Sequence, residues 1–245
     1  MKTLIIIPSR ISDTRLPGKP LLKINGLSII SHVFKKAEKA NIGQVVVATE
    51  DQAIIDDVKK NGGEAILTKN HHKTGTDRIY EALNKIDNSN IDLVMNLQGD
   101  EPLMNIEDIR NLNYQMIKNK SKIGTLASKI TDQKLYSNPN VVKVSTIKNL
   151  EDDNFPEAIN FSRKTLEQSE NIYNHLGIYC YHLETLKKFV SYNQSDNEIK
   201  TRLEQMRALD NNIKINVALA RSSTIGIDTK EDFVAIKKIM EYKSK

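Results

Sequence analysis

The sequence contains one cysteine and no tryptophan among its 245 residues. A single cysteine excludes an internal disulfide framework and cannot build a cysteine-based zinc site by itself. Because Cys180 lies in an apolar and aromatic run, we interpret it as a small buried side chain rather than a nucleophile. Aromatic residues make up only 5% of the chain, which disfavours a nucleic-acid surface that depends on stacking rings.

The sequence also lacks a long apolar run near its N-terminus. The run at residues 4–7 is four residues long and is followed at once by Pro8, Ser9 and Arg10, so it is neither the core of a signal peptide nor a membrane span. We therefore expect a cytoplasmic protein without a membrane partner. The net charge of +5 is modest and the lysines are spread along the chain, so we expect no nucleic-acid partner either.

What the chain does contain is a cation-rich loop directly after its first predicted strand. Residues 4–7 are unbroken by charge, a pattern typical of a strand that is buried on both faces of a parallel sheet. The following loop is rich in Pro and Gly and carries Arg10, Arg15 and Lys19. Three cations within ten residues at the end of a first strand indicate a site for a polyanion. The alternative is a solvated basic turn, and the sequence has neither the Walker nor the dinucleotide-binding glycine pattern.

Helices and strands are predicted to alternate through the first hundred residues. Apolar residues recur at helical spacing over 30–37 and 54–58, and short buried strands are expected at 45–48 and 64–67. Such alternation with short links implies parallel strands that are joined by right-handed crossovers. We therefore predict an α/β fold with a mostly parallel central sheet flanked by helices, in a single domain over 1–245.

The second half of the chain has a different character. Residues 125–182 are rich in strand-like segments with few helices between them, so we predict a smaller β-rich extension there, of the kind that often supplies a dimer face. Residues 199–209 are expected to form one helix.

Two turns carry further candidate residues in the first half. In the HHKTGTDR segment, Thr74 and Gly75 offer a hydroxyl and free N–H groups at an expected helix N-terminus, and Arg78 follows in its first turn. We expect the adjacent rings of His71 and His72 to point apart, which disfavours a metal site.

Two aspartates are candidate metal ligands. Asp100 follows a glycine at the end of a predicted strand over 92–98, where α/β folds place a Mg²⁺ ligand beside nucleotide phosphates. A turn residue that caps the next helix is the alternative. Asp228 precedes another expected helix with Thr229 as its N-cap, and its local sequence fits a capping role equally well.

These motifs together resemble one enzyme family, the cytidylyltransferases that activate 3-deoxy-D-manno-octulosonate (KDO), also called CMP-KDO synthetases. The resemblance extends over nearly the whole chain in seven blocks that occur in the same order. The blocks are IPSRISDTRLPGKPL (7–21), GTDR (75–78), LQGDEP (97–102), NFSR (160–163), HLGIY (175–179), LEQMRAL (203–209) and GIDTKED (226–232). One departure from the family pattern is Ser9, where alanine is usual.

The resemblance implies a Rossmann-like nucleotidyltransferase fold and a Mg²⁺-dependent reaction. The anomeric 2-hydroxyl of KDO would attack the α-phosphorus of CTP and give CMP-KDO and pyrophosphate, for lipopolysaccharide biosynthesis. A homodimer is implied as well. Because a bound Mg²⁺ would lower the pKa of the attacking hydroxyl, no side-chain general base is obligatory.

The resemblance also assigns roles to individual residues. Catalysis is expected of Arg10, Lys19 and Asp100; nucleotide binding of Ser9, Arg10, Arg15, Lys19, Thr74, Gly75, Arg78 and Gln98; sugar binding of Arg163, His175, Tyr179, Glu204 and Gln205; and Mg²⁺ binding of Asp100 and Asp228.

Two other functions stay open at this point. One is a cytidylyltransferase for a related acidic sugar, such as 8-amino-KDO or a nonulosonate, and the other is a non-catalytic nucleotide-binding relative. The presence of both aspartates and all three loop cations disfavours the second. A purely structural histidine is the alternative for His175, and a plain helix with Leu203 and Met206 in the core is the alternative for the LEQ block.

Overall fold

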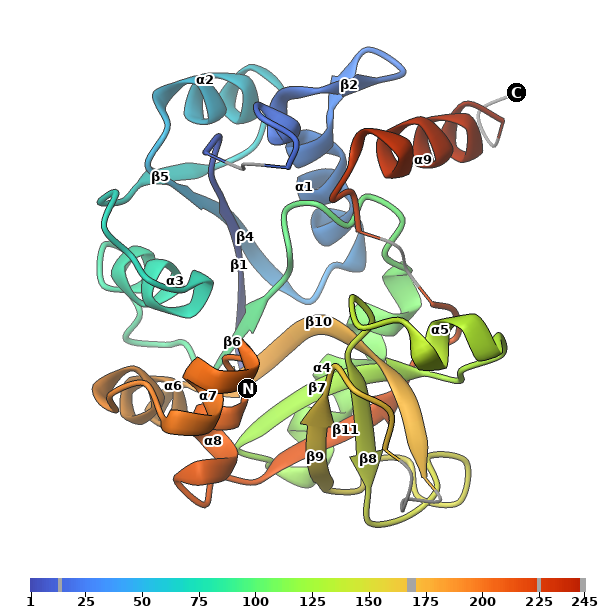
Figure 1. Cartoon of the computed structure of the whole chain (residues 1–245). Helices are drawn as coiled ribbons and strands as arrows, with labels where there is room; N and C mark the ends of the chain where they lie inside the picture. The colour runs from blue at the N-terminus through green and yellow to red at the C-terminus, as the bar shows by residue number, and fades with distance from the viewer. Residues whose placement is uncertain (13–14, 167–170, 224–225, 243–245) are drawn as a thin grey trace. The chain divides into compact units, whose positions relative to one another are not determined.

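The structure is a computed structural model that describes residues 1–12, 15–166, 171–223 and 226–242. Its contacts divide the chain into two compact units. The N-terminal unit comprises residues 2–91 and 95–106 together with the described residues from 226 onward, and the central unit comprises Met1, residues 92–94 and residues 107–223. Figure 1 shows the course of the chain through both units.

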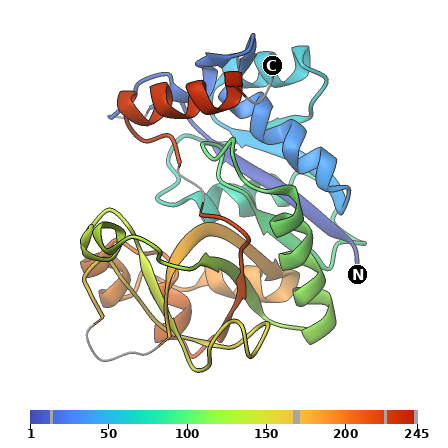
Figure 2. The ribbon, with the colours of Figure 1, turned by 90° about the vertical axis from the view of Figure 1, so that its right-hand side faces the viewer.

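The N-terminal unit is built on parallel strands that are covered by helices on both faces. Its elements are β1 (Thr3–Ser9), η1 (Lys19–Leu21), β2 (Lys23–Ile24), β3 (Leu27–Ser28), α1 (Ile29–Ala40), β4 (Gly43–Thr49), α2 (Gln52–Lys60), β5 (Ala65–Leu67), α3 (Gly75–Leu83) and α9 (Lys230–Tyr242). β4 pairs with β1 and with β5, both in parallel. Helices α1 and α2 cover one face of these strands and α3 covers the other (Figure 2).

The burial of β1 explains why this strand is so apolar. Leu4, Ile5, Ile6 and Ile7 are all inaccessible to solvent, as the unbroken apolar pattern predicts. The chain passes from the central unit to the N-terminal unit within strand β6 (Leu93–Asn96). Directly after this strand, the N–H group of Leu97 donates to the carbonyl of Ile6 at 3.3 Å. The turn after β6 therefore runs beside the end of β1.

The central unit contains a mixed sheet. Its elements are α4 (Ile106–Asn119), β7 (Ile123–Ser128), α5 (Gln133–Ser137), β8 (Lys143–Thr146), β9 (Ala158–Ser162), β10 (Ile172–His182), α6 (Leu183–Ser191), α7 (Asp196–Thr201), α8 (Met206–Asp210) and β11 (Ile215–Leu219). β7 runs parallel to β11 and antiparallel to β10, and β8 lies antiparallel between β10 and β9. The prediction of an α/β fold with a mostly parallel sheet flanked by helices is confirmed.

Two local features of the central unit bear on the predictions. The register between β10 and β7 shifts between Leu176 and Tyr179, which marks a β-bulge inside the HLGIY block. Cys180 is completely buried in β10, and burial raises the pKa of its thiol, so its interpretation as a buried structural residue is confirmed.

None of the helices in the described part of the chain combines the length and the apolar character that a membrane span requires.

The prediction of a single helix over 199–209 is wrong. The chain forms two short helices instead, because Arg202 adopts a left-handed conformation with φ 54° and ends α7. The LEQ segment, residues 203–205, therefore forms a turn before α8. Glu198 of α7 and Arg207 of α8 hold this turn together across its ends.

The Glu198–Arg207 pair is the most deeply buried ion pair among those of the described residues. Both side chains are only 3% exposed, and the guanidinium donates to the carboxylate through Nε at 2.7 Å and through Nη2 at 2.6 Å. Burial by itself raises the pKa of Glu198, but hydrogen bonds from Arg207 and Gln194 outweigh it and hold the pKa below its usual value.

Replacing only the cation of the Glu198–Arg207 pair should lower the free energy of unfolding far more than replacing both partners. Arg207→Met leaves an unpaired carboxylate in the interior, and we expect it to lower the free energy of unfolding by about 3–5 kcal/mol. The free energy of unfolding of the double variant Glu198→Gln/Arg207→Met should fall clearly less than that of Arg207→Met, because no buried charge remains. Urea unfolding of the three proteins measures both values; equal losses in the single and double variants would contradict this account.

Candidate active site

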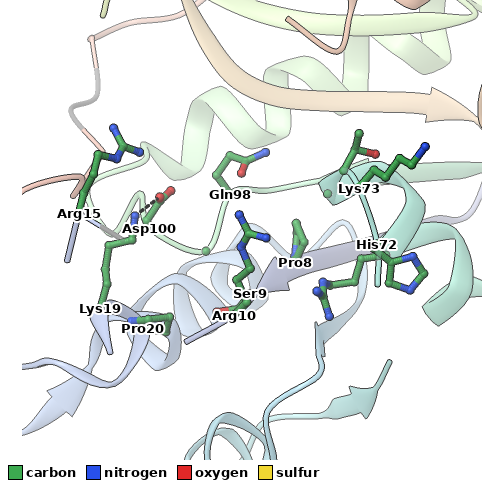
Figure 3. Close-up of a pocket in the computed structure, with 14 residues that line it drawn as sticks. Pro8, Ser9, Arg10, Arg15, Lys19, Pro20, His72, Lys73, Gln98 and Asp100 are labelled. Atoms are coloured by element: carbon green, nitrogen blue, oxygen red, sulfur yellow. Dashed lines mark hydrogen bonds and ion pairs between the residues drawn. The ribbon is translucent and has the colours of Figure 1, made fainter. Parts of the chain in front are cut away.

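A pocket of about 250 Å³ lies in the N-terminal unit at the carboxyl end of β1 (Figure 3). It brings together all the residues that the sequence predicts for nucleotide binding, along with one predicted metal ligand. These residues are Ser9, Arg10, Arg15, Lys19, Thr74, Gly75, Arg78, Gln98 and Asp100. Arg15, Lys19 and Asp100 lie at one end of the pocket, and His72 and Lys73 lie at the other (Figure 3).

Three segments position these side chains, and a glycine lets them approach. β1 delivers Ser9, the N-terminus of α3 delivers Thr74 and Gly75, and the turn after β6 delivers Gln98 and Asp100. A side chain at position 99 would lie 3.0 Å from the carbonyl oxygen of Pro8 and 3.1 Å from Cδ1 of Ile30. The turn can pass this close to the end of β1 because that residue is glycine.

The ammonium of Lys19 connects the two predicted metal ligands. Its Nζ lies 2.8 Å from Oδ2 of Asp100 and 3.5 Å from Oδ1 of Asp228, and its side chain is only 7% exposed. Arg15 reaches the same Oδ1 atom of Asp228 through Nη2 at 2.7 Å. The two carboxylates therefore face one shared cation, although 128 residues separate them in the sequence (228 − 100).

Asp228 is not the capping residue of α9. Thr229 and Asp232 cap this helix reciprocally: the Asp232 carboxylate accepts from the N–H group of Thr229 at 2.9 Å, and the Thr229 hydroxyl accepts from the N–H group of Asp232 at 3.2 Å. Asp232 also accepts from the N–H group of Asp228 at 3.1 Å. The carboxylate of Asp228 is thereby left to the cations of the pocket.

The donor atoms of this corner suit a magnesium ion. Within the described ranges, no group of three or more His, Cys, Asp or Glu side chains is arranged to hold a metal. Mg²⁺ does not need such a cage, since it is usually held by one or two carboxylates together with phosphate oxygens and water. Asp100 and Asp228 supply two carboxylates next to the loop cations.

The guanidinium of Arg78 is buried and is held by two residues that sequence reasoning missed. Its Nη2 donates to Oε2 of Glu50 at 2.5 Å and its Nη1 donates to Oγ1 of Thr68 at 2.6 Å. Glu50 directly follows β4 and Thr68 directly follows β5. Their positions at strand ends, on the same edge as Ser9, were the signal that could have found them.

Two buried hydroxyl groups in this region have no protein partner. Oγ of Ser9 and Oγ1 of Thr76 make no hydrogen bond within the described residues. A buried unpaired hydroxyl is unfavourable, so such groups are rare in folded proteins. Ser9 also lines the pocket, so its unpaired hydroxyl lies beside the space that a ligand would occupy.

The adjacent histidines do not point apart as predicted. Their rings stack with centroids 5.5 Å apart, because residues 71 and 72 lie in a loop rather than in an extended strand. Nε2 of His72 makes a close hydrogen bond with Glu81. Burial alone would raise the pKa of Glu81, but hydrogen bonds from Lys85, Lys69 and His72 lower it to about 2.

The residues predicted for sugar binding all lie in the central unit. His175 and Tyr179 belong to β10, with ring centroids 5.4 Å apart, and the pKa of Tyr179 is raised by burial and by the charge of nearby Glu204. Gln205 lies beside Glu204 in the turn before α8. Arg163 directly follows β9 and is exposed.

The hydrogen bonds of His175 define its protonation. The Thr125 hydroxyl donates to the carbonyl of Ile178 at 2.7 Å, so its oxygen accepts from Nε2–H of His175 at 3.0 Å. Removal from water lowers the pKa of His175 to about 3. The imidazole is therefore neutral at physiological pH, and Nδ1 carries the free lone pair.

The fold and the pocket define a nucleotidyltransferase. The structure aligns over 100% of the chain with UDP-glucose pyrophosphorylase in complex with UDP-glucose, at a TM-score of 0.75 and 12% identity, which is a likeness of fold alone. A closer match is the CMP:2-keto-3-deoxy-manno-octonic acid synthetase complexed with CTP, with a TM-score of 0.90 and 32% identity over 99% of this chain and 100% of that one.

Sequence comparison narrows the class to a family. Residues 4–215 match the family model described as cytidylyltransferase. A 3-deoxy-manno-octulosonate cytidylyltransferase of Nitrobacter winogradskyi is 40% identical over 241 residues, 98% of this chain and 94% of the relative. A protein of the same description from Bartonella tribocorum is 38% identical over 98% of this chain and 99% of the relative. The chain belongs to the 3-deoxy-manno-octulosonate cytidylyltransferase family.

The neutral state of His175 predicts a specific acid sensitivity. Between its unfolded pKa of 6.5 and its folded pKa of about 3, the unfolded chain binds a proton that the folded chain does not. Stability is therefore lost as the pH falls through this window. His175→Gln keeps a donor for Thr125 but does not titrate. Between pH 6 and pH 4, we expect its free energy of unfolding to fall less steeply than that of the wild type, by up to about 1 kcal/mol per pH unit, as measured by urea unfolding. Superimposable pH profiles of the two proteins would refute the assignment.

Proposed function

We propose that this chain transfers CMP from CTP to the anomeric hydroxyl of KDO and releases pyrophosphate. The observation that carries the proposal is the pocket itself, which unites three cations, the Asp100 carboxylate and an orphaned hydroxyl in a chain of this family. A second carboxylate, that of Asp228, contacts two of these cations, Arg15 and Lys19. A chain that only binds nucleotides would not need both carboxylates at the triphosphate end.

The loop cations bind the triphosphate, and its oxygens replace the carboxylates that these cations contact in the ligand-free protein. Without a ligand, Lys19 and Arg15 neutralise Asp100 and Asp228. When the triphosphate enters, the ammonium and guanidinium groups turn to its oxygens and stabilise the charge that develops on the departing pyrophosphate. Arg10, exposed at the rim of the pocket, adds a third cation.

Asp100 and Asp228 are the residues that would hold Mg²⁺ once the cations leave them. The ion would supply Lewis-acid charge neutralisation and lower the pKa of the sugar hydroxyl. The protein groups orient the α-phosphate for in-line displacement, so positioning rather than a side-chain base contributes most of the rate.

The other end of the pocket recognises the nucleoside. Arg78 presents a guanidinium that Glu50 and Thr68 hold rigid, and the N-terminus of α3 at Thr74 and Gly75 offers backbone N–H groups. Rigid donors discriminate between bases because a wrong base leaves them unpaired. We assign the free hydroxyl of Ser9 to the same task.

An acidic polyol fits the side chains of the central unit. Arg163 offers a cation for a carboxylate, His175 offers an acceptor for a hydroxyl through Nδ1, and Glu204 and Gln205 offer further polar groups. KDO is favoured by the family, while 8-amino-KDO and nonulosonates remain substrates to compare. Family membership also supports a homodimer, a cytoplasmic location and a place in lipopolysaccharide biosynthesis as parts of the proposal.

The activity can be tested by pyrophosphate release. CTP, KDO and Mg²⁺ together should give pyrophosphate, and Asp100→Asn and Lys19→Ala should each reduce the rate by at least about 100-fold while the protein stays folded. Asp56→Asn and Lys23→Ala change exposed residues of the same types and should be fully active. No pyrophosphate from the wild type with KDO, 8-amino-KDO or a nonulosonate would refute the function.

The Glu50–Arg78 pair predicts a selective effect on nucleotide affinity. Glu50→Gln removes the charge that fixes the guanidinium, so KM for CTP should rise roughly tenfold with little change in KM for KDO. Glu38→Gln alters an exposed glutamate of α1 and serves as the matched control. Steady-state kinetics with each substrate varied in turn measure the split, and an unchanged KM for CTP would show that Arg78 does not depend on Glu50.

A further inference from the structure

One lysine of the central unit is completely buried and has no assigned role. Lys143 in β8 is 0% exposed and is among the largest fully buried side chains of the described chain. Its Nζ donates to the carbonyl oxygen of Asn138 at 2.7 Å and to that of Arg163 at 3.0 Å. No carboxylate of the described residues lies within ion-pair distance of it. Buried lysines are rare and are normally paired with an acidic group.

The two hydrogen bonds hold a particular point of the chain. Lys143 pairs with Ser162 on β9 and with Asn174 on β10, so the side chains of these three residues share one face of the sheet. Arg163 is the first residue after β9. The ammonium therefore fixes the main chain where Arg163, the cation predicted for the sugar carboxylate, leaves the sheet.

The fold alone does not explain the charge of Lys143. A neutral amide could donate to the same carbonyl oxygens without the unfavourable burial of a cation. The surroundings of Lys143 also disfavour its charged form. Burial lowers the pKa of Lys143, and the nearby guanidinium of Arg163 lowers it further. Two cations thus lie within electrostatic range of each other, and neither has an acidic partner among the described residues. An anion bound at Arg163 would relieve this repulsion.

We propose that Lys143 is a positioning residue for the carboxylate of the acidic sugar, which it serves by anchoring the main chain of Arg163 and by adding a buried positive charge behind it. This role rests on the proposed function. The chemistry it selects is a monoanionic sugar acid rather than a neutral sugar.

Substitutions at position 143 separate the charge from the hydrogen bonds. Lys143→Met removes both, and we expect KM for KDO to rise about tenfold with KM for CTP changed by less than about twofold. Lys143→Gln keeps a donor for the carbonyl oxygens but no charge, so its KM for KDO should lie between those of the wild type and Lys143→Met. Val144→Ala, which changes a buried apolar residue of the same strand, controls for general loosening of the fold and should leave the ratio of the two KM values unchanged.

The charge of the ligand provides a second and independent readout. Binding of KDO and of its C1 methyl ester, which lacks the negative charge, is compared by competition in the wild type and in the variants. The preference for KDO should fall by the same factor in Lys143→Met and in Lys143→Gln, namely the factor by which Lys143→Gln raises KM for KDO, since both variants lack the charge.

Two results would overturn the role of Lys143. One is an unchanged preference for KDO over the ester, and the other is an equal rise in both KM values. If Lys143→Met does not fold, Lys143→Gln decides the matter by the same criteria. Failure of the wild type to use any acidic sugar would instead overturn the proposed function, so the two failures are distinguishable.

Discussion

The contact of one lysine with two carboxylates organises the pocket of the N-terminal unit. Lys19 joins the loop after β1 to Asp100, 81 residues away, and to Asp228, 209 residues away. These charges satisfy one another before any ligand arrives, so the fold does not have to keep isolated charges in a partly buried site. The proposed ligands, a triphosphate and a metal ion, offer both signs of charge and would therefore replace these contacts without leaving any group unpaired.

The geometry of parallel strands explains why so few elements are needed around this contact. Ser9 is the last residue of β1, and Glu50 and Thr68 directly follow the neighbouring parallel strands β4 and β5, whose ends meet at one edge of the sheet. Gly99 allows the turn after β6 to reach the same edge. The sheet thus brings these polar residues together at the pocket, and their side chains need only small adjustments to contact a ligand.

Local patterns in the sequence predicted the parts of the site that depend on nearby residues. The buried first strand, the helix N-terminus at Thr74 and Gly75 and the carboxylate after Gly99 follow from hydrophobic pattern and turn chemistry. The remaining features depend on pairs that are distant in the chain or on competition between neighbours. The partner of Arg78 is 28 residues away, and Asp232 joins the predicted cap Thr229 at the start of α9, which leaves the carboxylate of Asp228 to the cations of the pocket. Arg202, which divides the predicted helix, adopts a left-handed conformation although it is not a glycine, so the local sequence contains no signal for the break.

The β-bulge in β10 sets a distance between two side chains without contributing any chemistry of its own. Residues four apart in a regular strand are separated by about 13 Å, whereas the rings of His175 and Tyr179 are 5.4 Å apart. The intervening residues are the inert Leu176, Gly177 and Ile178, and they take up the excess length because the partner strand advances by only two residues over the same interval. In the proposed function, an insertion or deletion in this strand would therefore change the spacing of two sugar-binding side chains while every polar residue stays the same.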